Sequence, residues 1–166
     1  MICPQCGFEN IQGEDECANC GFDLMSVDIP APSSEFEAEM VVIPLADLRH
    51  HKPLTIAPTA TAAEAVSQMQ QAGAGCLIVE EGGRVRGILS ERDLVMKLDH
   101  AKLDGVTVAD LMTADPVVLR PDDSIAVAIN KMAVGGFRHI PLVVDGQATG
   151  IVSARDVFKH ILASAK

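Results

Sequence analysis

The sequence predicts an α/β (α+β) fold in which two β-α-β-β-α repeats pack about a pseudo-two-fold axis, preceded by a small cysteine-rich domain. Three observations predict this organisation. The chain matches itself at an offset of 63 residues, strand-like and helix-like patterns alternate within each copy, and two CxxC pairs lie near the N-terminus. Hydrophobic residues make up 48% of the chain and aromatic residues only 3%, so we expect an aliphatic core.

The N-terminal domain is predicted to bind a metal ion. Cys3 and Cys6 form one CxxC pair, and Cys17 and Cys20 form the other. Two such turns facing each other supply the four sulfurs that tetrahedral Zn²⁺ prefers, and a glycine follows each pair, where the backbone needs unusual freedom. A segment of this length cannot fold by burial alone, since chains below about 40 residues rarely do. We therefore expect a structural zinc ion; iron and a redox disulfide are the alternatives.

The pattern CPQCG…CANCG resembles the zinc ribbon family, and the predicted ribbon covers residues 1–24. Many zinc ribbons bind nucleic acid or protein, but this one contains no Lys or Arg, so we expect a structural module or a docking site for a protein partner. Residues 25–44 are rich in Pro, Ser and Glu and are predicted to be a linker. Its last part, residues 40–44, is apolar and either stays free or packs on the body as an edge strand.

The internal repeat defines the rest of the chain. The offset superimposes Pro53 on Pro116 and Asp93 on Asp156, and the copies run from about residue 52 to 98 and from about 115 to 161. We expect a small compensated slip, with residues 76–79 aligned to 140–143. In the second copy the predicted elements are a strand at 117–119, a helix at 122–134, strands at 139–144 and 148–152 around an Asp145-Gly146 turn, and a helix from Ser153.

Each copy ends with the pattern G-h-h-S-x-x-D, and the second contains the strand-like run RHIPLVVD at residues 138–145. These motifs resemble the tandem cystathionine-β-synthase (CBS) domain pair, or Bateman module, with predicted repeats at 45–104 and 105–166. The resemblance implies a regulatory module that binds an adenosine-containing ligand, such as AMP, ADP, ATP or S-adenosylmethionine, between the repeats. It also implies a homodimer formed through the CBS repeats.

The repeated serine and aspartate allow two interpretations. Ser90 and Ser153 are predicted helix N-caps with Asp93 and Asp156 three residues later, an arrangement that stabilises a helix start without any ligand. The same groups also suit a nucleotide, since a carboxylate accepts hydrogen bonds from a ribose diol and a hydroxyl can contact phosphate. The resemblance implies these ligand roles for all four residues.

The two candidate clefts are not predicted to be equivalent. Arg138 and His139 fall where the first copy has Gly75 and Cys76, and the resemblance implies that cations at this place contact phosphates. We therefore expect the main site at Asp93, with Arg138 and His139 on the phosphates. The site at Asp156 is expected to be empty, weaker or suited to a less charged ligand. The Arg residue two positions after each motif serine is expected to form a surface ion pair, and Cys76 is expected to be a buried hydrophobe.

The charge of the chain narrows the class of partner. Lys and Arg number 13 against 23 Asp and Glu, and residues 1–40 carry nine acidic residues and no Lys or Arg. This charge disfavours nucleic acids and anionic membranes. The sequence has neither an apolar run of the roughly 18 residues that span a bilayer nor a secretory signal pattern, so we expect a cytoplasmic protein.

No nucleophile with an adjacent base, P-loop or open metal site is recognisable, so we expect no enzymatic activity. The leading hypothesis is a sensor of an adenine nucleotide or S-adenosylmethionine. The alternatives are a dimeric scaffold whose ribbon docks a protein and, less favoured by the charge, a transcriptional regulator.

Overall fold

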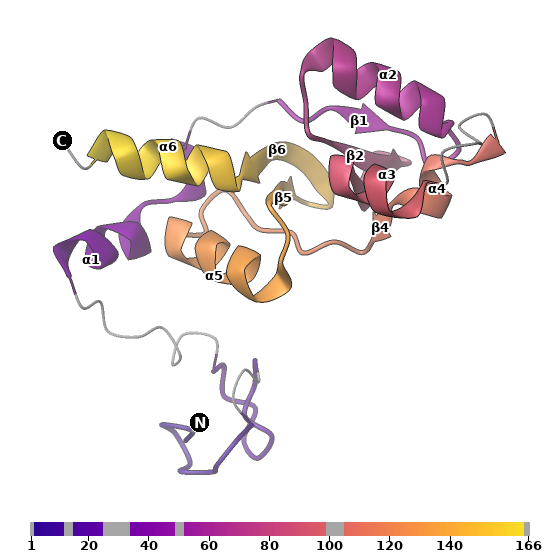
Figure 1. The fold of residues 1–166 in the computed structure, drawn as a ribbon. Coiled ribbons are helices and arrows are strands. Elements are labelled where there is room, and N and C mark those ends of the chain that lie inside the picture. Colours follow the sequence, from indigo (N-terminus) through magenta and orange to yellow (C-terminus); the bar gives the residue numbers. More distant parts are fainter. Residues whose placement is uncertain (1, 12–14, 25–33, 49–51, 99–104, 165–166) are drawn as a thin grey trace. The chain divides into compact units, whose positions relative to one another are not determined.

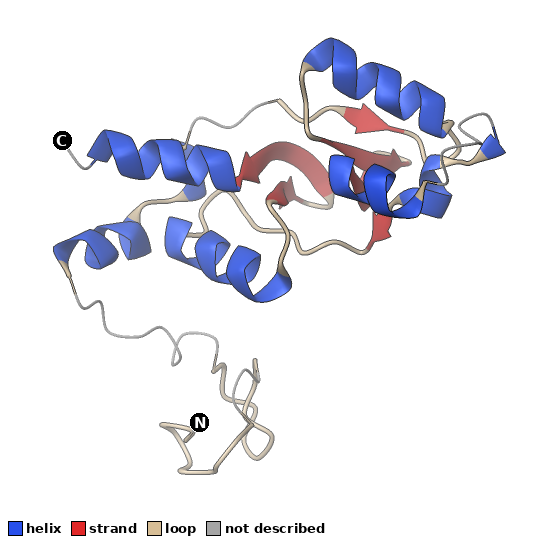
Figure 2. Cartoon of the chain, viewed as in Figure 1, coloured by secondary structure: helices blue, strands red, loops and turns tan. Residues whose placement is uncertain are grey.

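The computed structural model describes residues 2–11, 15–24, 34–48, 52–98 and 105–164 (Figures 1 and 2). It divides into two compact units, Met1–Glu39 and Met40–Lys166. Most of the predicted linker, residues 25–33, lies outside the described residues. Within the described part, no helix is long and apolar enough to cross a membrane.

The first unit consists of two turns with the same backbone pattern. In each turn the amide of the first cysteine donates to the carbonyl of the phenylalanine five residues later, at 2.9 Å in both. The glycine after the second cysteine has a left-handed φ, 72° in the first turn and 68° in the second, as predicted. The residues concerned are Cys3, Gly7 and Phe8 in the first turn, and Cys17, Gly21 and Phe22 in the second. This repetition brings the two CxxC pairs to face each other.

The first repeat folds around a four-stranded sheet of order β1-β2-β3-β4. β1 pairs with β2 in parallel, and the other neighbours are antiparallel. Helix α2 begins with a complete capping box at Thr61 and ends at Gly73, whose φ of 59° is left-handed. The elements of the repeat are β1 Thr55–Ile56, α2 Ala62–Ala72, β2 Cys76–Glu81, β3 Arg84–Ser90 and α3 Glu91–Lys97. The segment that follows the repeat adds α4 Val108–Leu111 and β4 Thr113–Ala114.

The second repeat has counterparts of α2 and α3, namely α5 and α6, but a smaller sheet. β5 and β6 form an antiparallel hairpin whose turn residues Asp145 and Gly146 both have positive φ, which confirms the predicted turn. The predicted strand at 117–119 is wrong, because only Leu119 forms a bridge, to Leu142, and no named strand includes these residues. The elements are α5 Ile125–Gly135, β5 His139–Val144, β6 Gln147–Ser153 and α6 Ala154–Ser164.

The equivalent elements of the two repeats keep a constant offset. β2 begins at Cys76 and β5 at His139, and each pairs at that residue with the serine that ends the returning strand. Both hairpins also shift register at the same place, between Val79 and Glu80 in one and between Leu142 and Val143 in the other. The predicted slip within these strands is therefore wrong.

Each repeat completes its core with a segment that lies outside it in sequence. Val108 and Leu111, which follow the first repeat, are buried in the core with Leu77 and Leu89. The segment before the first repeat, in turn, enters the core of the second. The buried residues of that segment are Met40, Leu45 and Leu48, which join the cluster of Ile125, Ile140, Leu142 and Val152.

Backbone hydrogen bonds fix both exchanged segments. The Leu45 amide donates to the Asp123 carbonyl at 2.8 Å, and the Val108 amide donates to the Ala60 carbonyl at 2.8 Å. Residues 40–44 were expected to be free or to form an edge strand. The segment packs on the body, as the second alternative expects, but as helix α1 (Glu35–Val42) and the 3₁₀ helix Leu45–Asp47. An isolated bridge between Pro44 and Ser124 takes the place of the expected edge strand.

Candidate metal centre and ligand pockets

The four cysteines of the first unit form one cluster. The Sγ atoms of Cys3 and Cys20 are 3.7 Å apart, those of Cys6 and Cys17 are 3.6 Å apart, and all four lie within 4.8 Å of one another. A Zn–S bond of ~2.3 Å in a tetrahedral site places its sulfurs ~3.8 Å apart. The donor set and its spacing therefore fit a single tetrahedral ion held by four thiolates.

Asn10 supports this cluster and was not identified from the sequence. Its side-chain amide donates to the Cys17 Sγ at 3.6 Å, and its Oδ1 accepts from the Ala18 amide at 2.9 Å. Burial raises the pKa of Cys17, but hydrogen bonds from the amides of Asn19 and Cys20 and from Asn10 lower it to about 6. These donors favour the thiolate form that a metal requires.

In the second unit, both repeated Ser–Asp pairs form the predicted capping arrangement. Oδ2 of Asp93 accepts from the Ser90 amide at 3.0 Å and from its hydroxyl at 2.5 Å, and Asp156 and Ser153 repeat these contacts with the same distances. Thr107 and Asp110 also form a capping box. Aspartate three residues after the N-cap therefore also occurs in a capping box outside the repeated motif. An aspartate at this helix position does not by itself indicate a ligand site.

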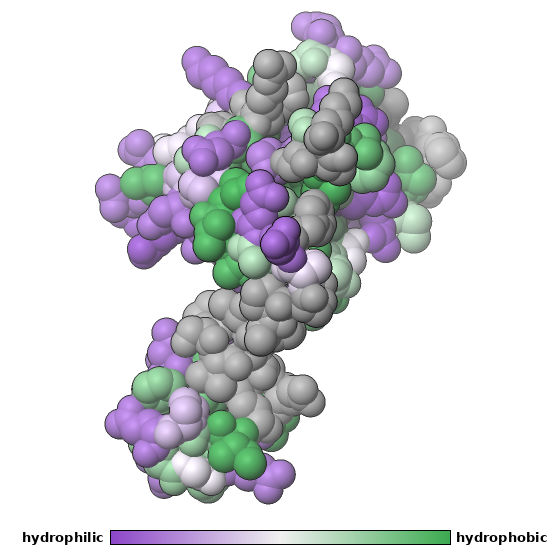
Figure 3. All heavy atoms as spheres, turned by 90° about the vertical axis from the view of Figure 1, so that its left-hand side faces the viewer, coloured by the Kyte–Doolittle hydropathy of each residue, from purple (hydrophilic) through white to green (hydrophobic). Residues whose placement is uncertain are grey.

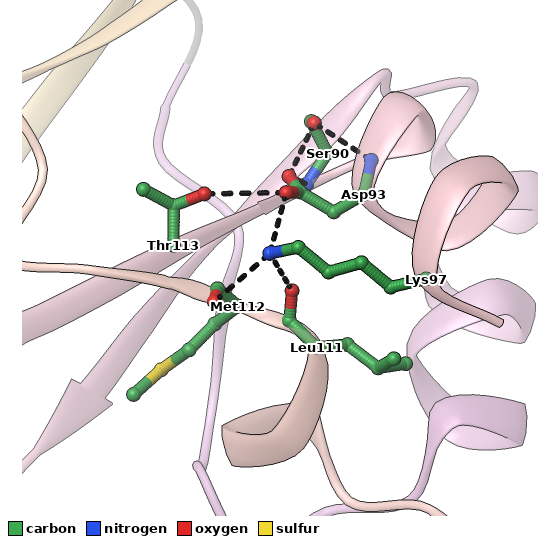
Figure 4. Close-up of polar contacts among 6 residues, drawn as sticks. All are labelled: Ser90, Asp93, Lys97, Leu111, Met112 and Thr113. Atoms are coloured by element: carbon green, nitrogen blue, oxygen red, sulfur yellow. Dashed lines mark hydrogen bonds and ion pairs between the residues drawn. The ribbon is translucent and has the colours of Figure 1, made fainter.

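Asp93 makes further contacts at its second oxygen (Figure 4). Oδ1 accepts from the Thr113 hydroxyl at 3.2 Å and forms an ion pair with the Lys97 ammonium at 3.0 Å. The ammonium also donates to the carbonyls of Leu111 and Met112, at 2.7 and 3.3 Å. The network therefore joins α3 to the segment between the repeats.

A first pocket of about 460 Å³ lies between the repeats, next to Asp93. It brings together four of the predicted site residues: Ser90, Asp93, Arg138 and His139. Three carboxylates line this pocket, those of Glu91, Asp93 and Asp115, together with the guanidiniums of Arg92 and Arg138. This pocket therefore carries more negative than positive side chains.

A second pocket of about 810 Å³ lies next to Asp156 and includes Ser153. Arg138 and His139 line it as well as the first pocket, and Lys52, Arg155 and Lys159 add further positive charge. Its carboxylates are those of Glu91 and Asp156 alone. Gly75 and Cys76 of the first copy bring no charge to this pocket, as the sequence predicts, but Lys52, Arg155 and Lys159 bring positive charge that the sequence does not predict there.

His139 lies at the boundary of the two pockets. A Cβ atom at Gly75 would lie 3.4 Å from its Nε2 and 3.6 Å from the Oε2 of Glu91, so the glycine leaves room for both groups. Burial lowers the pKa of His139, and the nearby Arg138 and Arg155 lower it further, against the opposing effect of Glu91 and Asp156. A lowered pKa favours the neutral form of the imidazole, which can still donate or accept a hydrogen bond.

The two arginines of the repeated motif do not form the expected ion pairs. Arg92 donates from Nη1 to the carbonyl of Gly136 at 3.0 Å, a contact between the repeats. The ion pairs found in the described part of the chain involve neither Arg92 nor Arg155. Cys76 is buried as expected, and this burial raises its pKa to about 12, so its thiol stays protonated.

Acid is expected to destabilise the second unit through its capping carboxyls. Burial raises the pKa of Asp93, but hydrogen bonds from Ser90 and Lys97 lower it below the usual value, and the Thr107 contacts lower the pKa of Asp110. A carboxyl whose pKa is lowered by folding stabilises the fold above its unfolded pKa, and this stability is lost as pH falls through the folded pKa. The melting temperature of this unit should therefore fall between about pH 5 and pH 2.

Thermal melts across this range check the expectation. Asp93→Asn should melt lower at pH 7 and show a shallower dependence on pH, since it removes one of the titrating groups. An Asp93→Asn profile parallel to that of the unaltered protein would contradict the role assigned to this carboxyl.

Comparison with known proteins agrees with this architecture. The family model of the CBS domain matches residues 45–100 and again 108–163. A 17.7 kDa protein of Acidianus ambivalens is 34% identical over 113 residues, which cover 67% of this chain and 68% of the relative. The CBS domain-containing protein YhcV of Bacillus subtilis is 33% identical over 104 residues, covering 62% and 74%.

Solved structures show the same fold. The CBS-domain protein ATU1752 of Agrobacterium tumefaciens has a TM-score of 0.64 at 30% identity, covering 69% of this chain and 88% of its own. CBSX2, solved in complex with AMP, has a TM-score of 0.65 at 22% identity and coverages of 74% and 99%. The CBS pair of MJ0100, solved with 5′-methylthioadenosine and S-adenosyl-L-methionine, has a TM-score of 0.67 at 21% identity and coverages of 75% and 99%. The family model covers both copies of the motif. This chain therefore belongs to the CBS domain family, with two CBS domains in tandem.

Proposed function

We propose that this chain is a non-enzymatic regulatory protein that binds an adenosine-containing ligand between its two CBS repeats. The observation that carries the proposal is the composition of the two pockets, each of which combines a Ser–Asp pair from one repeat with Arg138 and His139. Their volumes, about 460 and 810 Å³, lie in the range of small-molecule sites. The candidate ligands are AMP, ADP, ATP and S-adenosylmethionine.

Each predicted residue has a distinct role in this proposal. Asp93 and Asp156 are candidate acceptors for a ribose diol, and Ser90 and Ser153 lie beside them for phosphate or ribose contacts. Arg138 is a candidate phosphate ligand, since its guanidinium can form two parallel hydrogen bonds to an anion. His139 is a candidate hydrogen-bonding group for the same ligand. The ligands of CBSX2 and of MJ0100 support the adenosine class.

The ribbon is proposed to hold a structural Zn²⁺ through Cys3, Cys6, Cys17 and Cys20. Four protein thiolates leave no position for a substrate water, and the ion supplies folding free energy to a unit with a very small core. Ile2, Phe8 and Ile11 are exposed on this unit, and they are candidate contacts for a protein partner. A nucleic acid is not favoured.

A homodimer formed through the CBS repeats is part of the same proposal. Large hydrophobic side chains are exposed on helices of both repeats, and the face drawn in Figure 3 mixes hydrophobic with hydrophilic residues. The exposed hydrophobic residues include Val95 and Met96 on α3 and Phe158 and Leu162 on α6. Sedimentation of the metal-loaded protein should give twice the chain mass of 17.6 kDa.

A thermal-shift measurement with AMP, ADP, ATP and S-adenosylmethionine tests the ligand proposal. A ligand present at about 100 times its dissociation constant stabilises the folded state by ~2.7 kcal/mol, which raises the melting temperature by several degrees. We expect such a shift with at least one of these compounds, and a smaller one when Asp93 and Asp156 are both replaced by Ala.

The competing function is a dimeric scaffold in which the Ser–Asp pairs act only as helix caps. The capping geometry favours this alternative, because the Thr107–Asp110 pair has it without lining either pocket. Absence of a thermal shift with all four compounds would favour the scaffold, as would a shift unaltered in the double variant.

A further inference from the structure

The two Ser–Asp pairs differ in how many carboxylate lone pairs remain available to accept a hydrogen bond from a ligand. A carboxylate offers about four acceptor positions, two on each oxygen. In Asp93 all four are used, since Oδ2 accepts twice from Ser90 and Oδ1 accepts from Thr113 and Lys97 (Figure 4). A ribose diol can therefore bind Asp93 only after one of these contacts breaks.

The contact from Lys97 is costly to break. Its ammonium has three donors, and all three are used, by Oδ1 of Asp93 and by the carbonyls of Leu111 and Met112. The Asp93 side chain is 14% exposed and the Lys97 side chain 42%, so water screens this ion pair in part, while the two carbonyls hold the ammonium in place. Lys97 therefore competes directly with a ligand hydroxyl for Oδ1.

Asp156 is free of this competition. Its Oδ2 accepts from Ser153 as in the first repeat, but within the described part of the chain its Oδ1 accepts no hydrogen bond. The residue is 8% exposed and lines the second pocket. An oxygen of a pocket-lining carboxylate that accepts no hydrogen bond from the protein is available to a ligand hydroxyl.

The sequence explains the difference between the repeats. The constant offset of the repeats places His160 where the first repeat has Lys97, so no ammonium reaches Asp156 from this helix position. Thr113 belongs to β4, which pairs with β3, whereas the sheet of the second repeat contains only β5 and β6 among the described residues. Both groups that fill Oδ1 of Asp93 are therefore peculiar to the first repeat.

The charges of the two pockets agree with this asymmetry. The Asp156 pocket contains Lys52, Arg155 and Lys159, which belong to none of the ion pairs of the described residues. In the Asp93 pocket, Arg92 is bound to the Gly136 carbonyl, and Asp115 adds a further negative charge. A phosphate is therefore attracted to the second pocket more strongly than to the first.

We infer that a nucleoside phosphate binds through Asp156, and that Lys97 is the specificity-determining residue that closes the Asp93 pocket to a ribose. The inference rests on the proposed function and selects one of its two sites. It reverses the preference for Asp93 that the sequence predicts, because the structure places more cations and an open acceptor at Asp156.

Titration calorimetry of the full, metal-loaded chain with AMP tests this inference. We expect the unaltered protein to bind about one AMP per chain, Asp156→Asn to weaken it at least ~10-fold, and Asp93→Asn to change it less than ~3-fold. Lys97→Met should open the first pocket and raise the stoichiometry to about two, and adding Asp93→Asn to that variant should return it to about one.

Two matched variants separate the role of Lys97 from a general effect of charge or folding. Arg86→Met also removes a cation and an ion pair, the one with Glu81, and should keep one AMP site. Lys97→Arg keeps the charge and should also keep one site. Because the Lys97→Met effect is a gain of binding, misfolding cannot mimic it.

Each other outcome overturns the inference. It fails if Asp93→Asn abolishes binding while Asp156→Asn does not, if the unaltered protein binds two AMP molecules, or if Lys97→Met still binds one; in all three cases the proposed function survives. If neither the unaltered protein nor Lys97→Met binds AMP, and the thermal-shift compounds also give no shift, the proposed function fails together with the inference.

Discussion

Replacing Cys17 by Ser is expected to lower the zinc content from about one ion per chain to a small fraction and to unfold the first unit. Cys3 and Cys17 form much of the buried core of this unit, with Leu24 as the only other buried apolar residue among those described. Binding of structural zinc supplies on the order of 10–16 kcal/mol to small domains of this kind. Elemental analysis after dialysis measures the ion directly, and thiol titration shows whether the remaining cysteines become reactive.

Cys76→Ser is the matched control for this experiment. Cys76 lies in β2 of the second unit and outside the cysteine cluster, so this variant should retain about one zinc per chain. The second unit has its own cores, and its melting transition should persist in Cys17→Ser. An undiminished zinc content in Cys17→Ser, or iron in place of zinc in the unaltered protein, would contradict the assignment.

Leu45→Ala is expected to reduce the free energy of unfolding of the second unit by about 2–5 kcal/mol, and to lower its melting temperature by about 10 °C or more. Leu45 is completely buried although it lies outside both sheets, in the segment before the first repeat. Its removal leaves a cavity against Ile125 and Ile140, which belong to the second repeat. Denaturant unfolding followed by circular dichroism measures the change.

Val42→Ala is the corresponding control from the same segment. Its side chain is 75% exposed, so the substitution should change stability by less than about 0.5 kcal/mol. If Leu45→Ala were as mild as Val42→Ala, the segment would not be part of the core of the second repeat.

The sequence predicts the local features of this protein well. The spacing of the four cysteines, the positive φ of the glycines after them, and the serine and aspartate at the start of α3 and α6 depend on residues only a few positions apart. The internal repeat likewise predicts a second copy of each helix. Local geometry of this kind follows from residue type and spacing alone.

Features that depend on distant contacts could not be predicted. Lys97 looks like an ordinary solvated residue at a helix end, and only the position of β4 and of the Leu111 carbonyl makes it part of a saturated network. Two of the cations of the second pocket come from Lys52 and Lys159, which no motif connects to Asp156. The slip in the strand alignment was predicted because residues 76–79 resemble 140–143 in hydrophobicity. The strands of the structure keep the constant offset of the repeats instead.

The exchange of segments between the repeats has a consequence for biosynthesis. Leu45 leaves the ribosome before any of the strands and helices whose core it fills, and it has no stable place until the second hairpin follows. The first repeat, for its part, stays open until Leu111 has been made. A chain interrupted directly after the first repeat would carry an unpaired piece of the second core and a gap in the first, so neither repeat can complete its core from its own residues alone.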